Sequence, residues 1–395
     1  MKVVFINCAS NGSTGNIIYS IHKELLKTGN KSYVFYGVGN KRDEFYHRVG
    51  NYFTLHFHSV MSKITGKQGY FSFFPTLKLI MQIKKINPEV IHLHNLHGSY
   101  LCLPLLFMFL KKAHSKIIIT LHDCWAFTGK CPYFTAAGCY LWQKSCGKCI
   151  QLESYPKSSF FDCTKSNLKA KKRWLSGFRN LTVTAVSHWL QKTANTSFLK
   201  KYGVKCIYNG IDTQVFYPHN SEEIKRKYGI THKKIILGVA SDWSERKGLS
   251  MFMKISKVLN GNEVIVLVGL TKNQIESLPE GIIGIERTES MEELAELYSS
   301  ADVFINASKE ETFGLVTAEA LACGTRAIVF NSTACAEVIT NDRCGIVVKN
   351  DSELMSAVRN LLNEETKTTV IASRLDDEFK VEKMIEEYMN EYKNQ

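Results

Sequence analysis

Short apolar runs alternate with longer amphipathic segments along most of this chain. The runs have the length and composition of buried strands, and glycine, asparagine or charged residues usually end them. The predicted strands are Val3–Asn7, Val34–Tyr36, Val90–Leu93, Lys116–Leu121, Leu181–Val186, Val204–Tyr208, Ile235–Val239, Val264–Val268, Ile282–Ile285, Val303–Ile305, Ala327–Phe330 and Ile346–Val348.

Between the strands, apolar residues recur every three or four positions, which predicts helices that cover a parallel sheet. Two segments break the alternation. Asn40–Gly69 is rich in histidine and aromatic residues and receives no firm assignment, and Cys124–Tyr155 is rich in cysteine, glycine and aromatic residues. The predicted helices are Ile17–Leu26, Leu77–Ile86, Leu101–Lys112, Leu168–Leu175, Met251–Leu259, Met291–Ser299, Leu315–Cys323, Glu353–Leu362 and Asp377–Tyr392.

The strand and helix pattern restarts near Ile235, after a stretch interpreted as a linker, Thr213–Asn220. We therefore predict an α/β chain with two Rossmann-like parallel-sheet domains and an interdomain cleft. The predicted boundaries are 1–213 for the N-terminal domain, with a cysteine-rich insert at about 124–155, 214–376 for the C-terminal domain and 377–395 for a C-terminal helix.

The composition of the 395 residues, 45% of them apolar, is ample for two or three packed cores. No apolar stretch approaches the roughly 20 residues of a membrane span. The N-terminus lacks a signal-peptide cleavage pattern, so we expect a cytoplasmic protein. In that compartment the twelve cysteines are expected to be thiols or metal ligands rather than disulfides.

The net charge of +13 is unevenly distributed. Residues 1–215 hold 29 Lys and Arg against 8 Asp and Glu, whereas residues 216–395 hold 21 against 29. A basic domain suits nucleic acid, an anionic membrane surface or a phosphate-bearing substrate, and a solvated basic face is the plain alternative. No nucleic-acid motif is recognised and the second half is acidic, so we predict a membrane surface and no nucleic acid.

Polar loops follow several predicted strands, at the sheet edge where open parallel sheets bind their ligands. There is no G-x-G-x-x-G dinucleotide fingerprint. A cleft between two sheets would gather these loops into one site. They are Gly12–Gly15, His94–His97, His122–Asp123, Arg246–Gly248 and Glu311–Gly314.

The loop and helix that follow Val303–Ile305 carry the most specific candidate chemistry. Glu311 and Glu319 bracket a predicted helix N-terminus and could accept hydrogen bonds from sugar or ribose hydroxyls, while that N-terminus offers N–H groups to an anion. Arg246 and Lys247 supply fixed positive charge for a diphosphate, and His122 is a candidate donor or acid/base. Each has a plain alternative when taken singly: a capping and a surface glutamate, a solvated turn, and a strand-end histidine with satisfied hydrogen bonds.

Four segments in this order resemble glycosyltransferase family 4, whose members are retaining enzymes of the GT-B fold with an E-x7-E motif. The resemblance implies an N-terminal acceptor domain, a C-terminal nucleotide-sugar domain and a last helix that crosses back to the first domain. The segments are NGIDTQVFYP at Asn209–Pro218, ERKG at Glu245–Gly248, SKEETFGLVTAEALACG at Ser308–Gly324 and AEVI at Ala336–Ile339.

The resemblance also implies roles for individual residues. Glu311 would contact hydroxyls of the donor sugar and Glu319 the ribose, and Lys247 with Arg246 would neutralise the departing diphosphate. His122 would lie near the donor sugar and the acceptor. Further donor-side candidates are Phe313, Gly314, Leu315, Gly15 and Asn209, and acceptor-side candidates are Gly12, Thr14, His94 and Asp123.

The family's usual mechanism is front-face substitution with retention and without an obligatory divalent metal, so charge stabilisation by fixed cations and dipoles is expected to dominate. Two departures concern the phosphate contacts. Ala240–Trp243 stands where the family often carries Gly-Arg-Leu, and Ala336 stands where proline is common.

Cys131, Cys139, Cys146 and Cys149 are spaced C-x7-C-x6-C-x2-C, which fits either a structural zinc site or free thiols. The segment His122–Phe134 resembles a bacterial polysaccharide-synthesis branch of the family that includes colanic acid transferases.

These observations predict a retaining glycosyltransferase at the inner face of the bacterial plasma membrane. It would move a sugar from a nucleotide-diphosphate sugar to a growing, lipid-linked cell-surface polysaccharide. One alternative is a GT-B-like nucleotide-sugar epimerase or hydrolase, which needs no acceptor. The other is a basic nucleic-acid-binding protein.

Overall fold

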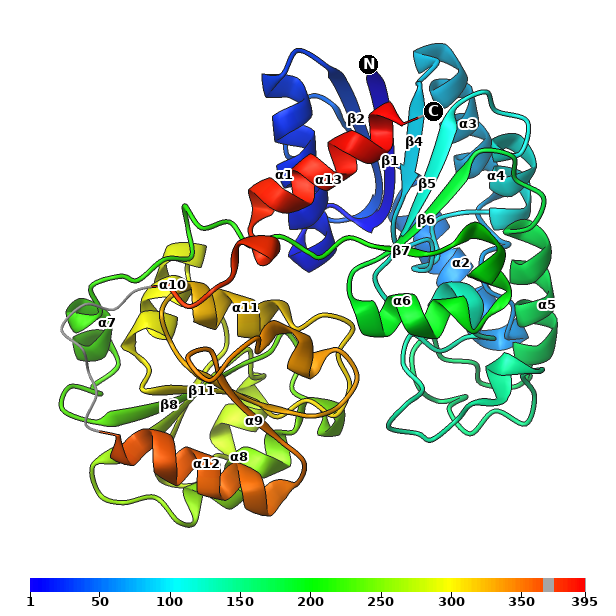
Figure 1. The fold of residues 1–395 in the computed structure, drawn as a ribbon. Coiled ribbons are helices and arrows are strands. Elements are labelled where there is room, and N and C mark those ends of the chain that lie inside the picture. Colours follow the sequence, from blue (N-terminus) through cyan, green and yellow to red (C-terminus); the bar gives the residue numbers. More distant parts are fainter. Residues whose placement is uncertain (365–372, 395) are drawn as a thin grey trace. The chain divides into compact units, whose positions relative to one another are not determined.

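A computed structural model describes residues 1–364 and 373–394 of the chain. The chain divides into two compact units (Figure 1). Unit 1 comprises Met1–Ile207 with Ile385–Gln395, and unit 2 comprises Tyr208–Met384. Each unit is a parallel sheet covered by helices, which confirms the predicted fold class of two Rossmann-like domains.

The sheet of unit 1 has seven strands in the order β3-β2-β1-β4-β5-β6-β7. All neighbouring pairs are parallel, and β1 lies between β2 and β4, with Val3 opposite Ser32 and Val90. Helices cover both faces, so the strands are apolar on both sides. The strands are β1 Lys2–Ala9, β2 Lys31–Val38, β3 Tyr46–Arg48, β4 Val90–Leu93, β5 Lys116–Leu121, β6 Leu181–Ala185 and β7 Lys205–Cys206.

The helices of unit 1 lie on both faces of this sheet, α1 and α13 on one and α3, α4 and α5 on the other (Figure 1). The first loop is shorter than predicted, because β1 extends to Ala9 and α1 begins at Gly12. The helices are α1 Gly12–Lys27, α2 Tyr52–Thr65, α3 Phe73–Ile86, α4 Leu103–Leu110, α5 Thr164–Trp174 and α6 His188–Asn195, with short 3₁₀ turns at Trp125–Phe127, Leu141–Gln143 and Phe198–Tyr202.

The unassigned segment Asn40–Gly69 contains strand β3 and helix α2. Asn51 caps α2 in a reciprocal capping box with Thr54, and Gly66 ends it in the left-handed conformation. This helix was not predicted, because apolar side chains occupy its outer face as well as its inner one, which weakens the amphipathic pattern.

Helix α13, Val381–Lys393, carries the end of the chain back onto the sheet of unit 1. The hydroxyl of Tyr392 lies 2.8 Å from Nδ1 of His92 on β4, and that of Tyr388 lies 3.0 Å from Oγ1 of Thr120 on β5. A separate 3₁₀ turn, Asp377–Phe379, precedes the helix, so the predicted helix 377–392 is two elements.

The sheet of unit 2 has six parallel strands in the order β10-β9-β8-β11-β12-β13. Its strands are β8 Lys234–Val239, β9 Glu263–Val268, β10 Ile282–Ile285, β11 Val303–Asn306, β12 Ala327–Phe330 and β13 Gly345–Val348. Its helices are α7 Glu222–Lys227, α8 Leu249–Ser256, α9 Lys272–Glu276, α10 Met291–Ser300, α11 Leu315–Ala322 and α12 Asp351–Asn363, with 3₁₀ turns at Glu245–Lys247 and Cys335–Val338.

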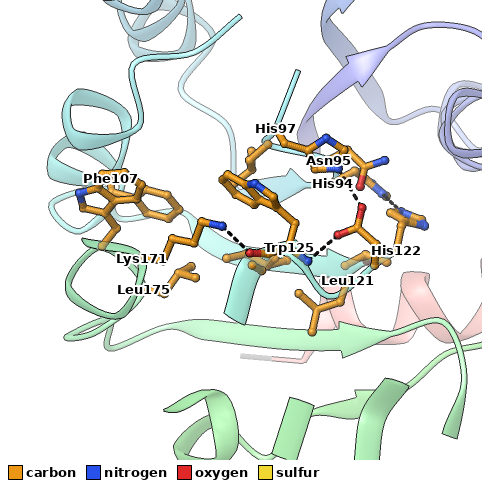
Figure 2. A pocket seen from close by; sticks show the side chains of 15 residues that line it. His94, Asn95, His97, Phe107, Leu121, His122, Trp125, Lys171 and Leu175 are labelled. Carbon is orange, nitrogen blue, oxygen red and sulfur yellow. Dashed lines mark hydrogen bonds and ion pairs between the residues drawn. The ribbon is translucent and has the colours of Figure 1, made fainter. Parts of the chain in front are cut away.

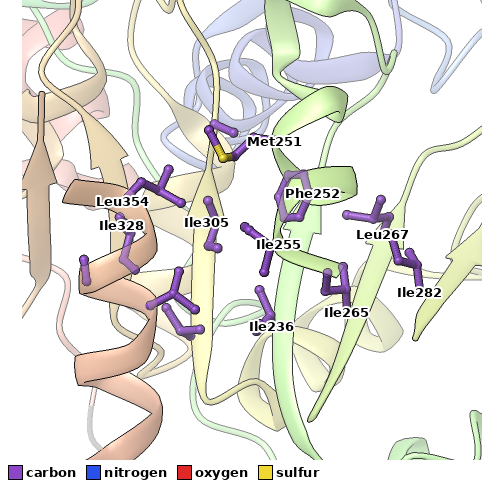
Figure 3. Packing of buried hydrophobic residues seen from close by; sticks show 14 of the residues in the cluster. Ile236, Met251, Phe252, Ile255, Ile265, Leu267, Ile282, Ile305, Ile328 and Leu354 are labelled. Atoms are coloured by element: carbon purple, nitrogen blue, oxygen red, sulfur yellow. The ribbon is translucent and has the colours of Figure 1, made fainter. Parts of the chain in front are cut away.

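Helices α8 and α12 close one side of this sheet over a continuous apolar core (Figure 3). Phe252 of α8 and Leu354 of α12 are fully buried there with Ile305 of β11. Trp243 joins the same core and donates its indole N–H to the carbonyl of Val268 at 2.9 Å. The unusual Ala240–Trp243 segment therefore has a packing role in this chain.

The predicted linker Thr213–Asn220 packs onto unit 2 instead of running free. Phe216 is buried against Tyr298 of α10, with ring centroids 6.2 Å apart. The backbone N–H of His219 donates to Oγ of Ser299 at 3.0 Å. The contact boundary between the units accordingly lies earlier, between Ile207 and Tyr208.

Candidate active site

In unit 2, the loop between β11 and α11 is shaped by Asn306 and Gly314. Asn306 donates to Oγ1 of Thr317 at 3.0 Å and accepts from the backbone N–H of Ser308 at 3.2 Å, which ties the strand end to the first helical turn. Gly314 has a φ of +98°, and a Cβ there would meet no atom closer than 3.6 Å. The backbone conformation, rather than lack of space, therefore requires glycine at the start of α11.

Lys247 and Glu311 form an ion pair next to this loop. Gly248 follows Lys247 with a φ of +76°, and a Cβ there would clash with the carbonyl of Ala307. This close approach brings the Glu245–Lys247 turn against the end of β11. The backbone N–H of Glu311 donates to Oγ1 of Thr333 at 2.8 Å, so Thr333 fixes the main chain of Glu311 while Lys247 pairs with its carboxylate.

Arg246 is anchored to the same loop. Its Nη1 donates to the carbonyl of Glu310 at 3.0 Å, and its own carbonyl accepts from the N–H of Lys309 at 2.9 Å. The side chains of Lys247 and Glu311 are only 16% and 10% exposed. Three of the predicted residues, Arg246, Lys247 and Glu311, are thus brought together as a largely buried charged cluster.

Glu319 lies on α11 and accepts a hydrogen bond from the hydroxyl of Tyr298 at 2.9 Å. Burial raises the pKa of Glu319 to about 7, although the hydrogen bond from Tyr298 lowers it. Near neutral pH this carboxyl is therefore divided between its protonated and ionised forms. Tyr298 had no functional signal in the sequence, because it lies on the inner side of α10.

Phe313 and Leu315 flank Gly314 but differ in what they offer a ligand. The Phe313 ring is buried against Tyr208 and Phe379, with centroids 5.9 and 6.0 Å away, so only its backbone faces the loop. Leu315 is the first residue of α11, where backbone N–H groups have no acceptor within the helix. This helix start is a place for an anion such as a phosphate.

Asn209 is buried in unit 2, where its segment holds the end of the chain. Next to it, a Cβ on Gly210 would clash with the backbone of Val381, and Ile211 pairs with Lys380 in an isolated β-bridge. The contacts of this segment are structural, and a donor role for Asn209 remains a prediction.

In unit 1, a pocket opens at the carboxyl ends of β4 and β5 (Figure 2). His94 and His122 meet there, with Nδ1 of the first 2.8 Å from Nε2 of the second. His97 pairs with Asp123 through Nε2 and Oδ2 at 2.8 Å. The predicted residues His94, His122 and Asp123 therefore line one pocket, to which the structure adds His97, and the four side chains form two hydrogen-bonded pairs.

Burial controls the protonation of this cluster. It lowers the pKa of His94 well below the usual range, and His92 and His122 add to this effect. It also lowers the pKa of His122 to about 4, although the charge of Asp123 opposes this shift. Burial opposes ionisation of Asp123, but the charge and hydrogen bond of His97 and the N–H of Trp125 together lower its pKa. At neutral pH, His94 and His122 are therefore neutral hydrogen-bonding groups, and His122 is not a strong acid or base.

The column of histidines continues below the pocket to His92, which sequence reasoning missed. Its Nδ1 lies 2.8 Å from the Tyr392 hydroxyl and its Nε2 lies 2.8 Å from Oγ1 of Thr120. The rings of His92 and His94 are 4.1 Å apart. Alternation along β4 places these two histidines on one face, which was a usable signal, whereas the distant partner Tyr392 gave none.

The predicted residues of the first loop lie in the first turns of α1. Gly12 is exposed with a φ of +76°, and Thr14 accepts a hydrogen bond from Nδ2 of Asn7 at 3.3 Å. A Cβ on Gly15 would clash with the carbonyl of Ser10, so this glycine allows α1 to pack against its own loop. Asn7 also accepts from the backbone N–H of Asn95 at 3.1 Å, which links this loop to the histidine loop.

The four cysteines of the insert line one pocket, together with Lys130. All twelve cysteines lie in the described residues, and none of them is in a disulfide. In the described residues, 1–364 and 373–394, no group of three or more His, Cys, Asp or Glu is arranged to hold a metal ion. Zinc binding by Cys131, Cys139, Cys146 and Cys149 therefore stays a prediction, and it would require the thiols to draw closer together.

Known proteins similar to this chain include bacterial glycosyltransferases. The putative colanic acid biosynthesis glycosyl transferase WcaC of Escherichia coli K12 is 23% identical over 421 residues, covering 98% of each chain. The N-acetyl-alpha-D-glucosaminyl L-malate synthase of Bacillus anthracis is 26% identical over 228 residues, covering 53% of this chain and 58% of that protein. The O-antigen biosynthesis glycosyltransferase WclY of Escherichia coli is 27% identical over 210 residues, covering 50% and 57%.

Solved structures of glycosyltransferases share the fold along the whole chain. Anabaena HepE, solved with UDP and glucose, has a TM-score of 0.70 at 14% identity and covers 99% of each chain. WaaG, a glycosyltransferase of lipopolysaccharide biosynthesis, has a TM-score of 0.68 at 15% identity and covers 100% of each chain. These similarities confirm the GT-B fold.

Two family models match the chain, one in each half. Residues 14–215 match the model described as Glycosyltransferase Family 4, and residues 233–364 match the model described as Glycosyl transferases group 1. The first match alone spans more than half of the chain. This protein is therefore a glycosyltransferase and belongs to glycosyltransferase family 4.

Proposed function

We propose that this protein transfers a sugar, with retention of anomeric configuration, from a nucleotide-diphosphate sugar to a growing, lipid-linked polysaccharide. The relatives named for colanic acid and O-antigen biosynthesis support the polysaccharide product. The structural neighbour solved with UDP and glucose supports a nucleotide-sugar donor.

The observation that carries this proposal is the charged cluster of unit 2. Lys247 and Arg246 are fixed beside Glu311, and the same loop leads into the start of α11 at Leu315. A diphosphate needs positive charge and N–H donors that are in place before the reaction, because reorganising them would add to the barrier. In the proposed complex, Lys247 and the helix start hold the diphosphate and Glu311 accepts hydrogen bonds from the donor sugar.

Glu319 is proposed to bind the ribose of the nucleotide. Its carboxyl is held by Tyr298 at 2.9 Å, which leaves lone pairs for ribose hydroxyls. Hydroxyl donors favour the ionised carboxylate, so nucleotide binding would lower the raised pKa of Glu319.

The histidine cluster of unit 1 is proposed to bind the acceptor, with contributions from Gly12 and Thr14. Because His122 has a pKa of about 4, it is a poor general base. We therefore assign the proton of the attacking hydroxyl to a phosphate oxygen of the leaving diphosphate. The bond between the anomeric carbon and the diphosphate breaks as the bond to the acceptor oxygen forms, and no divalent metal is required.

A thermal-shift screen of the full chain with UDP-, GDP- and ADP-sugars tests the donor site. One nucleotide class is expected to raise the unfolding temperature, because a ligand that binds the folded state stabilises it by mass action. Lys309→Ala is the matched control for Lys247→Ala, since Lys309 pairs with the exposed Glu245 at 2.9 Å outside the buried cluster. No shift with any nucleotide sugar would contradict the proposal.

Product analysis separates the transferase from an epimerase or a hydrolase. The donor identified by thermal shift is incubated with and without a lipid-linked oligosaccharide, in the presence and absence of EDTA. We expect sugar transfer only with the acceptor, an unchanged rate with EDTA and a product with the anomeric configuration of the donor. Release of free sugar or an altered nucleotide sugar without acceptor would favour the alternative class.

A further inference from the structure

Helices α2 and α3 of unit 1 present apolar side chains to solvent. On α2, Phe53, Phe57 and Ile64 lie at helical spacing and are 76%, 50% and 42% exposed. On α3, Phe74 and Met81 are 79% and 64% exposed. The outer face of α2 and α3 is defined here as Tyr52, Phe53, Phe57, Val60, Ile64, Phe74, Leu77 and Met81.

This outer face is separate from the face through which each helix packs on the domain. The buried residues of α2 are Leu55, His58 and Ser62, and those of α3 include Leu79 and Ile83. Each helix is thus already anchored by a buried side. Exposed apolar side chains gathered on the outer sides of helices in this way mark an interaction site in a folded protein.

Two contacts place the start of α3 beside α2. Nδ1 of His58 on α2 lies 2.6 Å from Oγ of Ser72, which directly precedes α3. At their starts, a Cβ on Gly50 would lie near Thr54 of α2 and Pro75 of α3. The backbone N–H of Ser159 donates to the carbonyl of Lys63 at 2.8 Å, and this contact brings the 73% exposed Phe160 to the end of α2.

The charged residues of α2, α3 and the segment that connects them have one sign. Between Glu44 and Glu89 the sequence contains no acidic residue. The same interval has six cations, and its five lysines are exposed in the structure. They are Arg48, Lys63, Lys67, Lys78, Lys84 and Lys85.

Exposed aromatic residues bordered by lysines are complementary to the surface of an anionic bilayer, where rings enter the interface and lysines meet phosphate headgroups. A second copy of this chain is a poor occupant, because pairing through this face would bring two sets of six cations together. In the described ranges, residues 1–364 and 373–394, no helix is long and apolar enough to cross a membrane. Helices of 14 residues can lie in the interface instead.

We propose that the outer face of α2 and α3 docks this protein onto an anionic lipid bilayer. The docking surface goes beyond the proposed function, since it is argued without reference to the nucleotide site. It also gives the basic excess of the first half of the sequence a defined location.

The test is sedimentation of the full chain with vesicles of phosphatidylcholine alone and of phosphatidylcholine mixed with phosphatidylglycerol. We expect binding to the mixed vesicles that weakens as salt is added, and little binding to the neutral ones. The triple variant Phe53→Ser, Phe57→Ser and Phe74→Ser should lose at least about tenfold in binding. Its matched control replaces three exposed residues of unit 2 by serine: Tyr217, Val258 and Val347.

The charge contribution is tested by Lys78→Gln with Lys85→Gln. Each lysine near an anionic surface contributes about 1 kcal/mol, so the pair should reduce binding by roughly tenfold or more. Lys272→Gln with Lys349→Gln removes the same charge from exposed positions of unit 2 and should bind within about twofold of the parent. Thermal unfolding of every variant checks that the fold is unchanged.

Three results would overturn the proposal. The triple serine variant could bind mixed vesicles as tightly as the parent, or the parent could bind neutral and mixed vesicles equally. The third is a parent that binds neither vesicle and forms dimers that the triple variant loses, because the face would then belong to a second copy. The donor thermal shift should be unchanged in all these variants, which separates failure of docking from failure of the proposed function.

Discussion

The carboxyl ends of the two sheets gather polar side chains of contrasting electrostatic character. In unit 1 the most buried groups are neutral imidazoles, His92, His94 and His122, which bond to one another and to hydroxyls. The ionised Asp123 lies beside them and pairs with His97. In unit 2 the buried groups are charged, with Lys247 against Glu311. Both arrangements avoid a buried charge without a partner, one by neutralisation through burial and the other by pairing.

This contrast has a chemical consequence for the two halves of the proposed reaction. The three neutral imidazoles can donate and accept hydrogen bonds with an uncharged hydroxyl compound, and burial keeps them neutral near neutral pH. A paired cation and anion can exchange partners with a ligand that carries both phosphates and hydroxyls. The electrostatic difference therefore suits unit 1 to an acceptor and unit 2 to a nucleotide-sugar donor.

The largest expected effect concerns the carboxyl edge of the unit 2 sheet, where Lys247 pairs with Glu311. Lys247→Ala removes the cation proposed to stabilise the leaving diphosphate and should lower kcat/KM by roughly 10²- to 10³-fold. Lys309→Ala, which removes an exposed lysine paired with Glu245, should leave kcat/KM within about twofold of the parent. Steady-state kinetics with the identified donor measures both. Equal activities of the two variants would show that the buried Lys247 has no special role in the reaction.

The next prediction concerns the cysteine-rich insert, which contacts the wall of the histidine pocket in unit 1. Lys171 donates to the carbonyl of Trp125 at 2.6 Å and lies 3.5 Å from its ring centroid, so it links the pocket wall to the insert. Burial lowers the pKa of Lys171 to about 7, while charge interactions with Cys131, Asp123 and Cys146 raise it. Burial raises the pKa of Cys146 to about 11 and raises that of Cys149, although backbone hydrogen bonds from Gly129 and Gln151, respectively, oppose this rise.

We expect one zinc ion per chain and a lower unfolding temperature after chelation. Two nearby lysines, Lys130 and Lys171, would balance the charge of a four-thiolate zinc site. Elemental analysis and thermal unfolding measure the two effects, with Cys146→Ser expected to lose the metal. Cys163→Ser is the control, because Cys163 bonds to the carbonyl of Thr65 at 3.2 Å instead of lining the pocket. Protein without zinc, whose stability is unaffected by chelators, would leave four free thiols.

A smaller effect is expected at the contact between α13 and the histidines of unit 1. Tyr392→Phe deletes the hydroxyl 2.8 Å from Nδ1 of His92 and leaves a buried polar atom without its partner. The free energy of unfolding should fall by about 1–3 kcal/mol. Urea unfolding measures the change, and Tyr217→Phe, at an exposed ring, should have little effect. The loss should be the same at pH 6 and pH 8, because burial keeps the pKa of His92 well below this range.

The sequence predicted elements whose signals are local. The alternation of apolar runs and amphipathic segments predicted the parallel sheets. The position of Glu311 shortly after the apolar run of β11 predicted a ligand-binding loop there. Helix α2 could not be predicted in this way, because it carries apolar residues on both sides and therefore lacks the one-sided apolar pattern of an amphipathic helix. A pattern read as irregular was in this case a helix with a second apolar face.

Partners distant in the sequence could not be predicted. Tyr392 meets His92 from the far end of the chain, and Tyr298 meets Glu319 from a different helix. These contacts decide whether a histidine is neutral or a carboxyl retains its proton, because burial sets the pKa. Residue types at the sites were therefore predictable, whereas their protonation states required the fold.

The smallest effect concerns the pH dependence of donor binding, through Glu319. Its pKa is raised to about 7, so at pH 6 about one-tenth of the carboxyls are ionised, and at pH 8 most are. If ribose hydroxyls require the ionised form, binding of the donor identified by thermal shift should strengthen by roughly tenfold from pH 6 to pH 8. Folding responds in the opposite direction. The raised pKa favours the folded state below the ordinary value of 4.5, and this contribution is lost as the pH rises from 4.5 to about 7.

Glu319→Gln separates this titration from every other group. The amide cannot ionise, so the variant should bind the identified donor weakly at both pH values and show no pH dependence in calorimetric titrations. The buried histidines His94 and His122 do not mask the effect, because burial lowers the pKa of His122 to about 4 and that of His94 well below its usual value. A parent protein whose affinity is flat from pH 6 to pH 8 would show that the carboxyl is already ionised before the nucleotide binds. The proposed ribose contact would then not depend on displacing a proton, and the two sheet edges would differ only in the Lys247–Glu311 pair.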